Sequence, residues 1–170
     1  MQALLAVAPN MKHATGPAEC ILLTRVAVDV CRACGVRAKP LAVTVEFHAD
    51  RDPDALIRLG FPGDVAGDDI WDGHLVCIAD RRLLLDLTID SMVWPEVGLY
   101  PVPFCEPVRG NFLAGGQMTL PVRGGRATYT ALPERRDYRS EPKWEQWPTE
   151  KIDALAAKVA ARAQNLGSQS

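Results

Sequence analysis

The sequence predicts an α+β domain in which a central N-terminal helix packs on an antiparallel β-sheet. Three observations predict it: a strongly apolar helix comes first, alternating apolar segments typical of strands follow, and an amphipathic helix closes the chain. The 170 residues suit one domain with a sizeable core, because 48% are hydrophobic and 24% are charged. We therefore expect a single domain over residues 1–170, with the segment 133–170 packed on its body.

The first predicted element is a helix that begins near Gly16 and ends before Gly35. Pro17 suits the first helical position, and glycine suits the position just past a helix end. The polar residues of the segment form one narrow stripe, so the helix should be mostly buried and central to the domain. This stripe consists of Arg25, Asp29 and Arg32.

Strands are predicted in the middle of the chain. Alternating apolar residues over Leu41–Phe47 predict a half-buried strand. Residues 48–70 read as a long acidic excursion, with a short helix around Asp54–Leu59. The apolar segments His74–Ala79 and Leu83–Thr88 are separated by three residues, which predicts a β-hairpin.

The remaining elements are shorter, except for the last. Residues 95–125 contain many prolines and glycines between short apolar pieces, so we expect short strands and turns there. A final strand is predicted at Arg126–Leu132. Thr149 is a good N-cap for a closing helix that runs to about Asn165. Its apolar residues have the spacing of one helix face: Ile152, Leu155, Ala156, Val159 and Ala163.

The predicted hairpin brings two polar residues together. If the three-residue loop pairs Ala79 with Leu83, His74 and Asp86 lie on the same face as diagonal neighbours, roughly 7–8 Å apart at Cα. A one-residue slip would place them on opposite faces. The other face then carries a continuous core surface, which supports this register: Leu75, Cys77, Ala79, Leu83, Leu85 and Leu87.

Cys20 lies in the opening turn of the predicted first helix. Backbone N–H groups point outward there and the helix dipole favours negative charge, which suits a thiolate nucleophile and an oxyanion hole. With His74 to move the proton and Asp86 to orient His74, the three residues predict a Cys-His-Asp site for acyl transfer. Each residue alone fits a packing role better, so the hypothesis depends on the combination.

The order and spacing of these residues resemble the transglutaminase-like superfamily. Its members typically carry a nucleophilic cysteine on a helix that ends in R-A-x-G-[IV]-x-A-[RK] about fifteen residues later. Here Gly35 follows Cys20 by fifteen residues, and Arg32–Lys39 reads Arg-Ala-Cys-Gly-Val-Arg-Ala-Lys. His74 in a strand, followed by Asp86-Leu87-Thr88, resembles the family's histidine strand and D-P-T motif, with leucine in place of proline. The resemblance covers roughly residues 15–90.

The resemblance implies a papain-like α+β core and a chemistry that needs no metal and no organic cofactor. It implies an amide hydrolase or transamidase that forms a thioester on Cys20, with a peptide, a protein or a small amide as substrate. Because the superfamily also contains non-enzymes, a non-catalytic binding or assembly domain on the same scaffold is the alternative. A third hypothesis is a metal-dependent hydrolase that uses His74 with nearby aspartates. The sequence leaves the oligomeric state open.

Residues near the proposed site have two interpretations each. Asn10, Lys12 or His13 is a candidate side-chain donor to the oxyanion, or else a surface residue. Trp71 and Trp94 either line a substrate groove or pack in the core. The aspartates around Trp71 favour a solvated acidic loop over a cation site: Asp68, Asp69 and Asp72.

The cysteines and the charge balance narrow the function classes. Cys31 and Cys34 form a C-x-x-C pair, but its place at a helix end and the lack of a second pair favour packing over a redox or zinc site. Five cysteines, an odd number, mostly in apolar surroundings, indicate reduced thiols in the cytoplasm. A net charge of -2 gives no basic footprint for nucleic acid or a membrane surface, and no apolar run approaches the roughly 20 residues of a membrane span.

Overall fold

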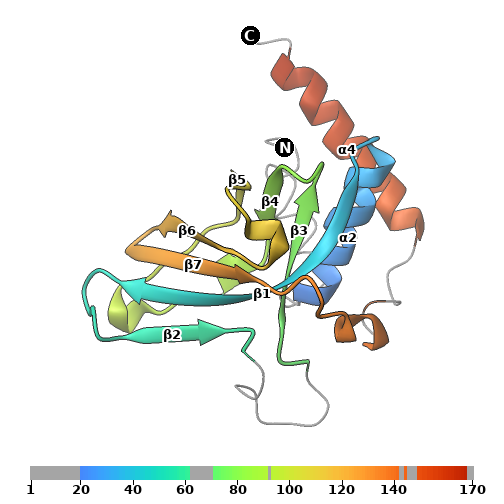
Figure 1. Cartoon of the computed structure of the whole chain (residues 1–170). Coiled ribbons are helices and arrows are strands. Elements are labelled where there is room, and N and C mark those ends of the chain that lie inside the picture. The colour runs from blue at the N-terminus through green and yellow to red at the C-terminus, as the bar shows by residue number, and fades with distance from the viewer. Residues whose placement is uncertain (1–19, 62–70, 92, 142–143, 145–148, 168–170) are drawn as a thin grey trace.

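The computed structural model describes residues 20–61, 71–91, 93–141, 144 and 149–167. In these residues it has two α-helices, seven strands and short 3-10 turns (Figure 1). The helices are α2 (Cys20–Ala33) and α4 (Thr149–Gly167). The strands are β1 (Ala38–Ala49), β2 (Leu56–Leu59), β3 (His74–Ala79), β4 (Leu83–Asp86), β5 (Phe104–Pro107), β6 (Gln117–Val122) and β7 (Gly125–Ala131).

Helix α2 is the buried helix that the sequence predicts. Its apolar side chains pack against β3 and against α4. The helix ends where expected, because the N–H of Gly35 donates to Arg32 and the N–H of Val36 donates to Cys31, each at 2.9 Å. Gly35 has a φ of 77°, which glycine adopts without steric cost at a helix end. The predicted start, near Gly16, lies outside the described residues.

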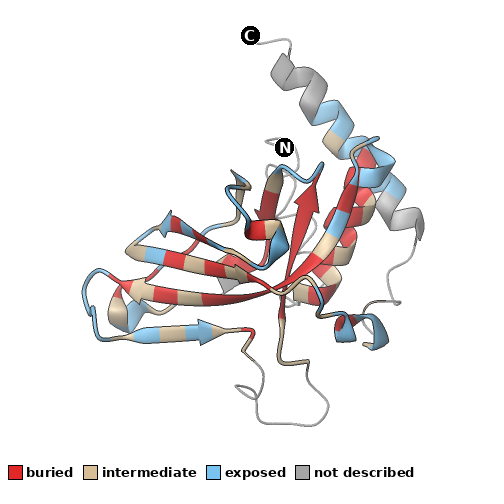
Figure 2. Ribbon diagram, in the orientation of Figure 1, coloured by how far each residue is buried: buried red, intermediate tan, exposed pale blue. Residues whose placement is uncertain are grey.

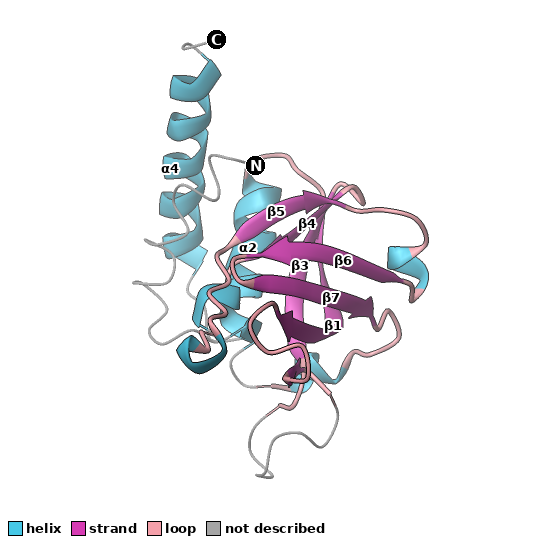
Figure 3. Cartoon of the chain, turned by 90° about the vertical axis from the view of Figure 1, so that its left-hand side faces the viewer, coloured by secondary structure: helices cyan, strands magenta, loops and turns pink. Residues whose placement is uncertain are grey.

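The strands form one antiparallel sheet, as predicted, in the order β5-β4-β3-β1-β7-β6, with β2 also paired to β1. Strand β1 is long enough to change partners. Its first half pairs with β3, and its second half lies between β2 and β7. The sheet curls (Figure 3). Inward-facing residues of β1, β3, β4, β6 and β7 therefore meet in a single apolar cluster.

Apolar residues on the two faces of the sheet form separate cores. The outer face of β3 and β4 packs on α2, with Cys77, Ala79 and Leu85 in that cluster. The inner face lines the inside of the curl, where Phe47 and Val76 are fully buried. Strand β3 is therefore buried at every position (Figure 2).

Two predicted elements differ from the structure. The alternation in Leu41–Phe47 predicts a half-buried strand, but Ala42 and Thr44 on its second face are also buried, at 1% and 7% exposure. Ala42 packs in a small cluster with Leu75 and Tyr138, a contact that no local pattern reveals.

The helix predicted around Asp54–Leu59 is wrong. Residues Leu56–Leu59 form β2, which pairs antiparallel with β1. Ile57 and Leu59 are partly buried against the inner core, whereas their neighbours Leu56 and Arg58 are exposed. This alternation has the period of a strand, and pairing with β1 outweighs a weak local helix signal.

The hairpin register is confirmed. Ala79 pairs with Leu83, and Cys77 pairs with Leu85. The connecting loop includes Asp80 and then Arg81, with φ values of 49° and 59°. Strand β4 ends at Asp86, two residues before the predicted end.

The predicted closing helix is also confirmed. Helix α4 packs its buried residues Leu155 and Ala156, with Val159 beside them, onto α2 (Figure 1). Between β7 and α4, Tyr138 is buried and Trp144 packs against it. No helix in the described part of the chain combines the length and apolar character that crossing a bilayer requires.

Candidate active site

Asp86 ends β4 inside the curl of the sheet and is 1% exposed. Its Oδ1 accepts hydrogen bonds from the backbone N–H and the hydroxyl of Thr88, both at 3.0 Å. Its Oδ2 accepts from Nε2 of His74 at 2.7 Å and from the hydroxyl of Tyr129 at 2.9 Å. Four donors thus hold one buried carboxylate, which is what a buried charge requires.

The same contacts keep Asp86 ionised. Burial by itself raises the pKa of the carboxyl, but the charge and hydrogen bond of His74 lower it, together with the bonds from Thr88 and Tyr129. The net pKa of Asp86 lies below its usual value. At neutral pH a negative charge therefore faces His74 across a short hydrogen bond.

His74 opens β3 and is 0% exposed. Burial by itself would lower the pKa of the imidazole, but Asp86, through charge and hydrogen bonding, and then Cys20 raise it to about 10. Near neutral pH the ring is therefore the imidazolium. Its Nδ1 is buried and makes no hydrogen bond to any described atom.

Cys20 is the first described residue of α2 and lies where β3 begins. Its Sγ is 3.8 Å from the carbonyl oxygen of Gly73, the residue before His74, and its side chain is partly exposed. One turn further along α2, the hydroxyl of Thr24 donates to the carbonyl of Leu75 at 2.9 Å. This buried bond fixes α2 on β3 and so keeps the thiol beside the imidazole. The proximity of Cys20 adds to the effect of Asp86 in raising the pKa of His74.

Sequence reasoning missed Tyr129. It lies on β7, and two strands, β1 and β3, separate β7 from β4 in the order of the sheet. Its hydroxyl reaches Asp86 because the sheet curls, and Phe104 packs edge-on against its ring with centroids 5.6 Å apart. A buried tyrosine hydroxyl needs a partner, but the sequence gives no signal of which one.

An aromatic cluster borders Cys20. Tyr138 packs edge-on against Trp71 and against Trp144, with ring centroids 6.0 and 5.0 Å apart. Cys20, like both tryptophans, packs against the buried set of side chains that contains Tyr138. Arg25 of α2 holds the far end of the cluster, because its Nη1 donates to the carbonyl of Trp144 at 2.7 Å and its guanidinium stacks on that indole.

Arg135 connects the segment after β7 to the residues that precede His74. It forms an ion pair with Asp72, stacks on Trp71 with its Cζ 4.9 Å from the ring centroid, and donates to the carbonyl of Gly60 at 3.4 Å. Asp137 completes this network with a second ion pair at 3.1 Å. The chain just before His74 is therefore held by a charged group rather than by sheet pairing alone.

The two tryptophans proposed to line a substrate groove lie in different parts of the structure. Trp71 and Cys20 pack against the same buried cluster, but Trp94 packs on Phe47 in the inner core, with centroids 5.1 Å apart. The structure thus does not bring Trp94 together with Cys20. The proposed oxyanion donors and two of the three loop aspartates lie outside the described residues: Asn10, Lys12, His13, Asp68 and Asp69.

The other cysteines are packing residues or lie apart from the site. Cys31 and Cys77 are buried together between α2 and β3. Cys34 is exposed, and its Sγ lies 3.7 Å from the carbonyl oxygen of Ala156 on α4. The C-x-x-C pair is thus divided between a core position and a helix–helix contact. In the described part of the chain, no three His, Cys, Asp or Glu residues gather in a way that would hold a metal ion.

Comparisons with models of protein families, with curated proteins and with solved structures find no match for this chain. The fold and the contacts of the site therefore carry the functional argument by themselves.

Proposed function

We propose that the chain is a cysteine-dependent acyl-transfer enzyme with a transglutaminase-like, papain-like core, acting through Cys20, His74 and Asp86. One observation carries the proposal: a partly exposed thiol lies beside a buried imidazole whose Nε2 is bonded to a fully satisfied carboxylate. In sites of this kind an adjacent imidazole activates the cysteine nucleophile. Nucleophile, proton carrier and orienting carboxylate are the parts that acyl transfer needs.

The proposed reaction has two steps. The sulfur of Cys20 attacks the carbonyl carbon of an amide, and a C–S bond forms. As the C–N bond breaks, His74 gives its proton to the leaving amine. Water or a second amine then attacks the thioester, the C–S bond breaks, and His74 takes the proton of the incoming nucleophile. Asp86 stays ionised throughout and stabilises the charged ring.

The proposed substrates are a peptide, a protein or a small amide, and no resident metal or organic cofactor has a role. Cys20 and Trp71 pack against the same buried cluster, which contains Tyr138. We assign Trp71 to the wall that a substrate contacts, and not Trp94, which lies in the inner core.

A second candidate is a non-catalytic domain in which His74 and Asp86 form a structural ion pair. The complete burial of both side chains favours it, because buried ion pairs also occur where they only hold a fold together. The two candidates differ in the reactivity of Cys20.

The test is alkylation with iodoacetamide at pH 7, with the labelled residues identified by mass spectrometry. Cys34 is the matched control, because its side chain is exposed. Partial desolvation of the thiol and the nearby Cys31 raise its pKa. We expect Cys20 to react at least about tenfold faster than Cys34, and Cys34→Ala to leave the Cys20 rate unchanged.

The role of the imidazole is tested by His74→Gln, which should slow the labelling of Cys20 at pH 7. Thermal unfolding of that variant shows whether it is folded, and Asp86→Asn provides a second change to the same pair. Labelling of Cys20 at the rate of Cys34 in the wild-type protein would instead support the non-catalytic domain.

A further inference from the structure

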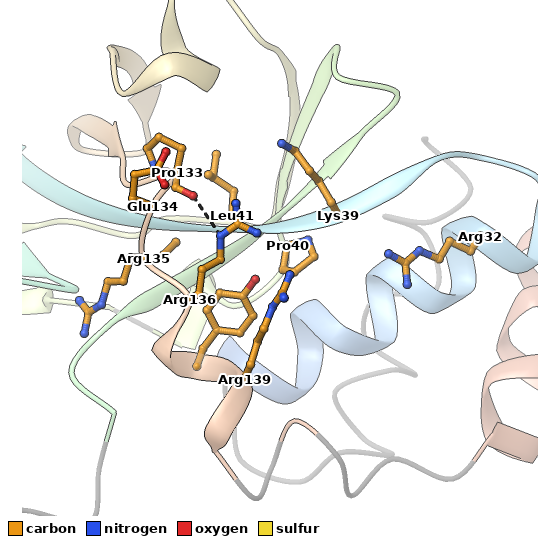
Figure 4. A pocket seen from close by; sticks show the side chains of 11 residues that line it. Arg32, Lys39, Pro40, Leu41, Pro133, Glu134, Arg135, Arg136 and Arg139 are labelled. Carbon is orange, nitrogen blue, oxygen red and sulfur yellow. Dashed lines mark hydrogen bonds between the residues drawn. The ribbon is translucent and has the colours of Figure 1, made fainter.

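A basic pocket lies beside the first half of β1, between that strand, the end of α2 and the segment after β7 (Figure 4). Its volume is about 180 Å³. Five of its lining residues are basic and one, Glu134, is acidic, although the whole chain has a net charge of -2. The basic residues are Arg32, Lys39, Arg135, Arg136 and Arg139.

Three of these guanidinium groups are directed toward the same place. Arg136 and Arg139 extend toward Pro40, and Arg32 extends from α2 toward it from the other side (Figure 4). Arg135 points away from the pocket (Figure 4) and forms ion pairs with Asp72 and Asp137. The pocket therefore keeps a cluster of cations after the neighbouring network is complete.

These cations have few anionic partners of their own. Arg32 forms an ion pair with Asp29 at 3.5 Å. Among the described residues, no carboxylate forms an ion pair with Lys39, Arg136 or Arg139. Arg136 donates to the backbone carbonyl of Pro133. Arg139 stacks on Tyr138, with its Cζ 6.0 Å from the ring centroid. Like charges held this close repel one another, and an anion between them relieves that repulsion.

The adjacent strand edge does not offer a place for another strand. The carbonyl of Ala38 accepts from Nε of Arg32 at 3.1 Å, and the carbonyl of Ala42 accepts from the N–H of Leu132 at 2.8 Å. Between them lies Pro40, which has no N–H to donate. A ligand here is therefore recognised by guanidinium groups and not by strand addition.

We propose that this pocket binds an oxyanion, a carboxylate or phosphate group of a small ligand, between Arg32, Arg136 and Arg139. Arginine forks match the geometry of both groups and bond them through paired N–H donors. The volume is below the roughly 300–1,000 Å³ of pockets that enclose a drug-sized molecule, so it holds an anionic group and not a whole cofactor. This binding does not depend on any reaction at Cys20.

The test uses the full chain with inorganic phosphate and with succinate, at constant ionic strength because salt screens such contacts. Calorimetry or NMR titration should show saturable binding of at least one probe, and the tighter probe identifies phosphate or carboxylate as the preferred group. The double variant Arg136→Gln/Arg139→Gln should weaken it by about tenfold or more, since hydrogen bonds to charged groups are lost.

Arg123→Gln is the matched control. Arg123 is also an exposed arginine stacked on a tyrosine, with its Cζ 5.6 Å from the ring centroid of Tyr100, but it lies outside the pocket. It should bind the probe as the wild-type protein does. The proposal is overturned if neither probe saturates, if the double variant binds equally well, or if Arg123→Gln weakens binding to the same extent. Thermal unfolding without ligand checks that each variant is folded.

Discussion

At the scale of single residues, the most informative group is the carboxylate of Asp86. Burying a charge is unfavourable unless nearly all of its hydrogen-bonding capacity is used. Here both oxygens accept two bonds each, from Thr88, His74 and Tyr129. The threonine of the Asp-Leu-Thr motif thus has a structural role, because its N–H and hydroxyl both donate to the carboxylate oxygen that His74 does not contact.

Tyr129→Phe tests this account. The change removes one donor and keeps the ring that packs on Phe104. We expect a loss of about 1–3 kcal/mol in the free energy of unfolding, because a buried charged acceptor loses a partner. Urea unfolding measures it. We expect Cys20 labelling to slow only slightly, since Nε2 of His74 still bonds Asp86; an unchanged stability would contradict the role given to the hydroxyl.

At the scale of elements, the junction between β2 and β3 sets the position of the imidazole. Gly60 directly follows β2 with a φ of 78°. A Cβ there would lie 2.6 Å from the carbonyl oxygen of Val43 and 2.8 Å from the backbone nitrogen of His74. Both are main-chain atoms, so the clash can be relieved only by moving the strands. A glycine is therefore required for β2 to pass so close to the start of β3.

Gly60→Ala should accordingly slow the labelling of Cys20 and lower stability. Gly35→Ala is the matched control, because Gly35 has nearly the same φ but no atom within 4 Å of the place where a Cβ would lie. In the control, the free energy of unfolding should fall by about 1–2 kcal/mol from backbone strain alone, and the labelling rate of Cys20 should not change. Gly60→Ala should lose more, because the steric clash adds to a similar backbone strain. Equal losses and equal labelling rates in the two variants would show that the close approach to His74 has no consequence.

At the scale of the whole molecule, the buried ion pair makes unfolding depend on pH. The pKa of His74 is about 10 when folded and about 6.5 when unfolded. Its contribution is therefore complete below pH 6.5 and is lost as the pH rises toward 10. The folded pKa of Asp86 is lowered, so its contribution is complete above the unfolded value of about 3.9 and is lost as the pH falls through the folded pKa.

Urea unfolding from pH 5.5 to 9.5 measures the contribution of His74, which is lost at alkaline pH. The free energy of unfolding should fall by up to about 1.4 kcal/mol per pH unit from this one group. In Asp86→Asn the imidazole loses the charge that keeps it protonated, so this fall should disappear. An NMR titration of the wild-type ring gives the same answer without a variant, and a His74 midpoint near 6.5 would refute it.

The curl of the sheet also explains how much of the site the sequence could predict. The alternation in His74–Ala79 and in the following strand predicts the register that puts His74 and Asp86 on one face, and the structure has that register. No local pattern predicts Tyr129, because its contact with Asp86 crosses two strands. The helix expected around Asp54–Leu59 is wrong for the same reason, since pairing with β1 decides its conformation.

The elements with strong local signals can be predicted from the sequence alone. Apolar periodicity, the glycine at position 35 and the length of the hairpin loop act over a few residues, so they predict α2, the β3–β4 pair and α4. The groups that face the charged side chains are set by tertiary contacts. The curl that brings β4 and β7 together, the thiol beside the start of β3 and the arginines gathered beside Pro40 all depend on contacts between distant segments. Such contacts have no period in the sequence.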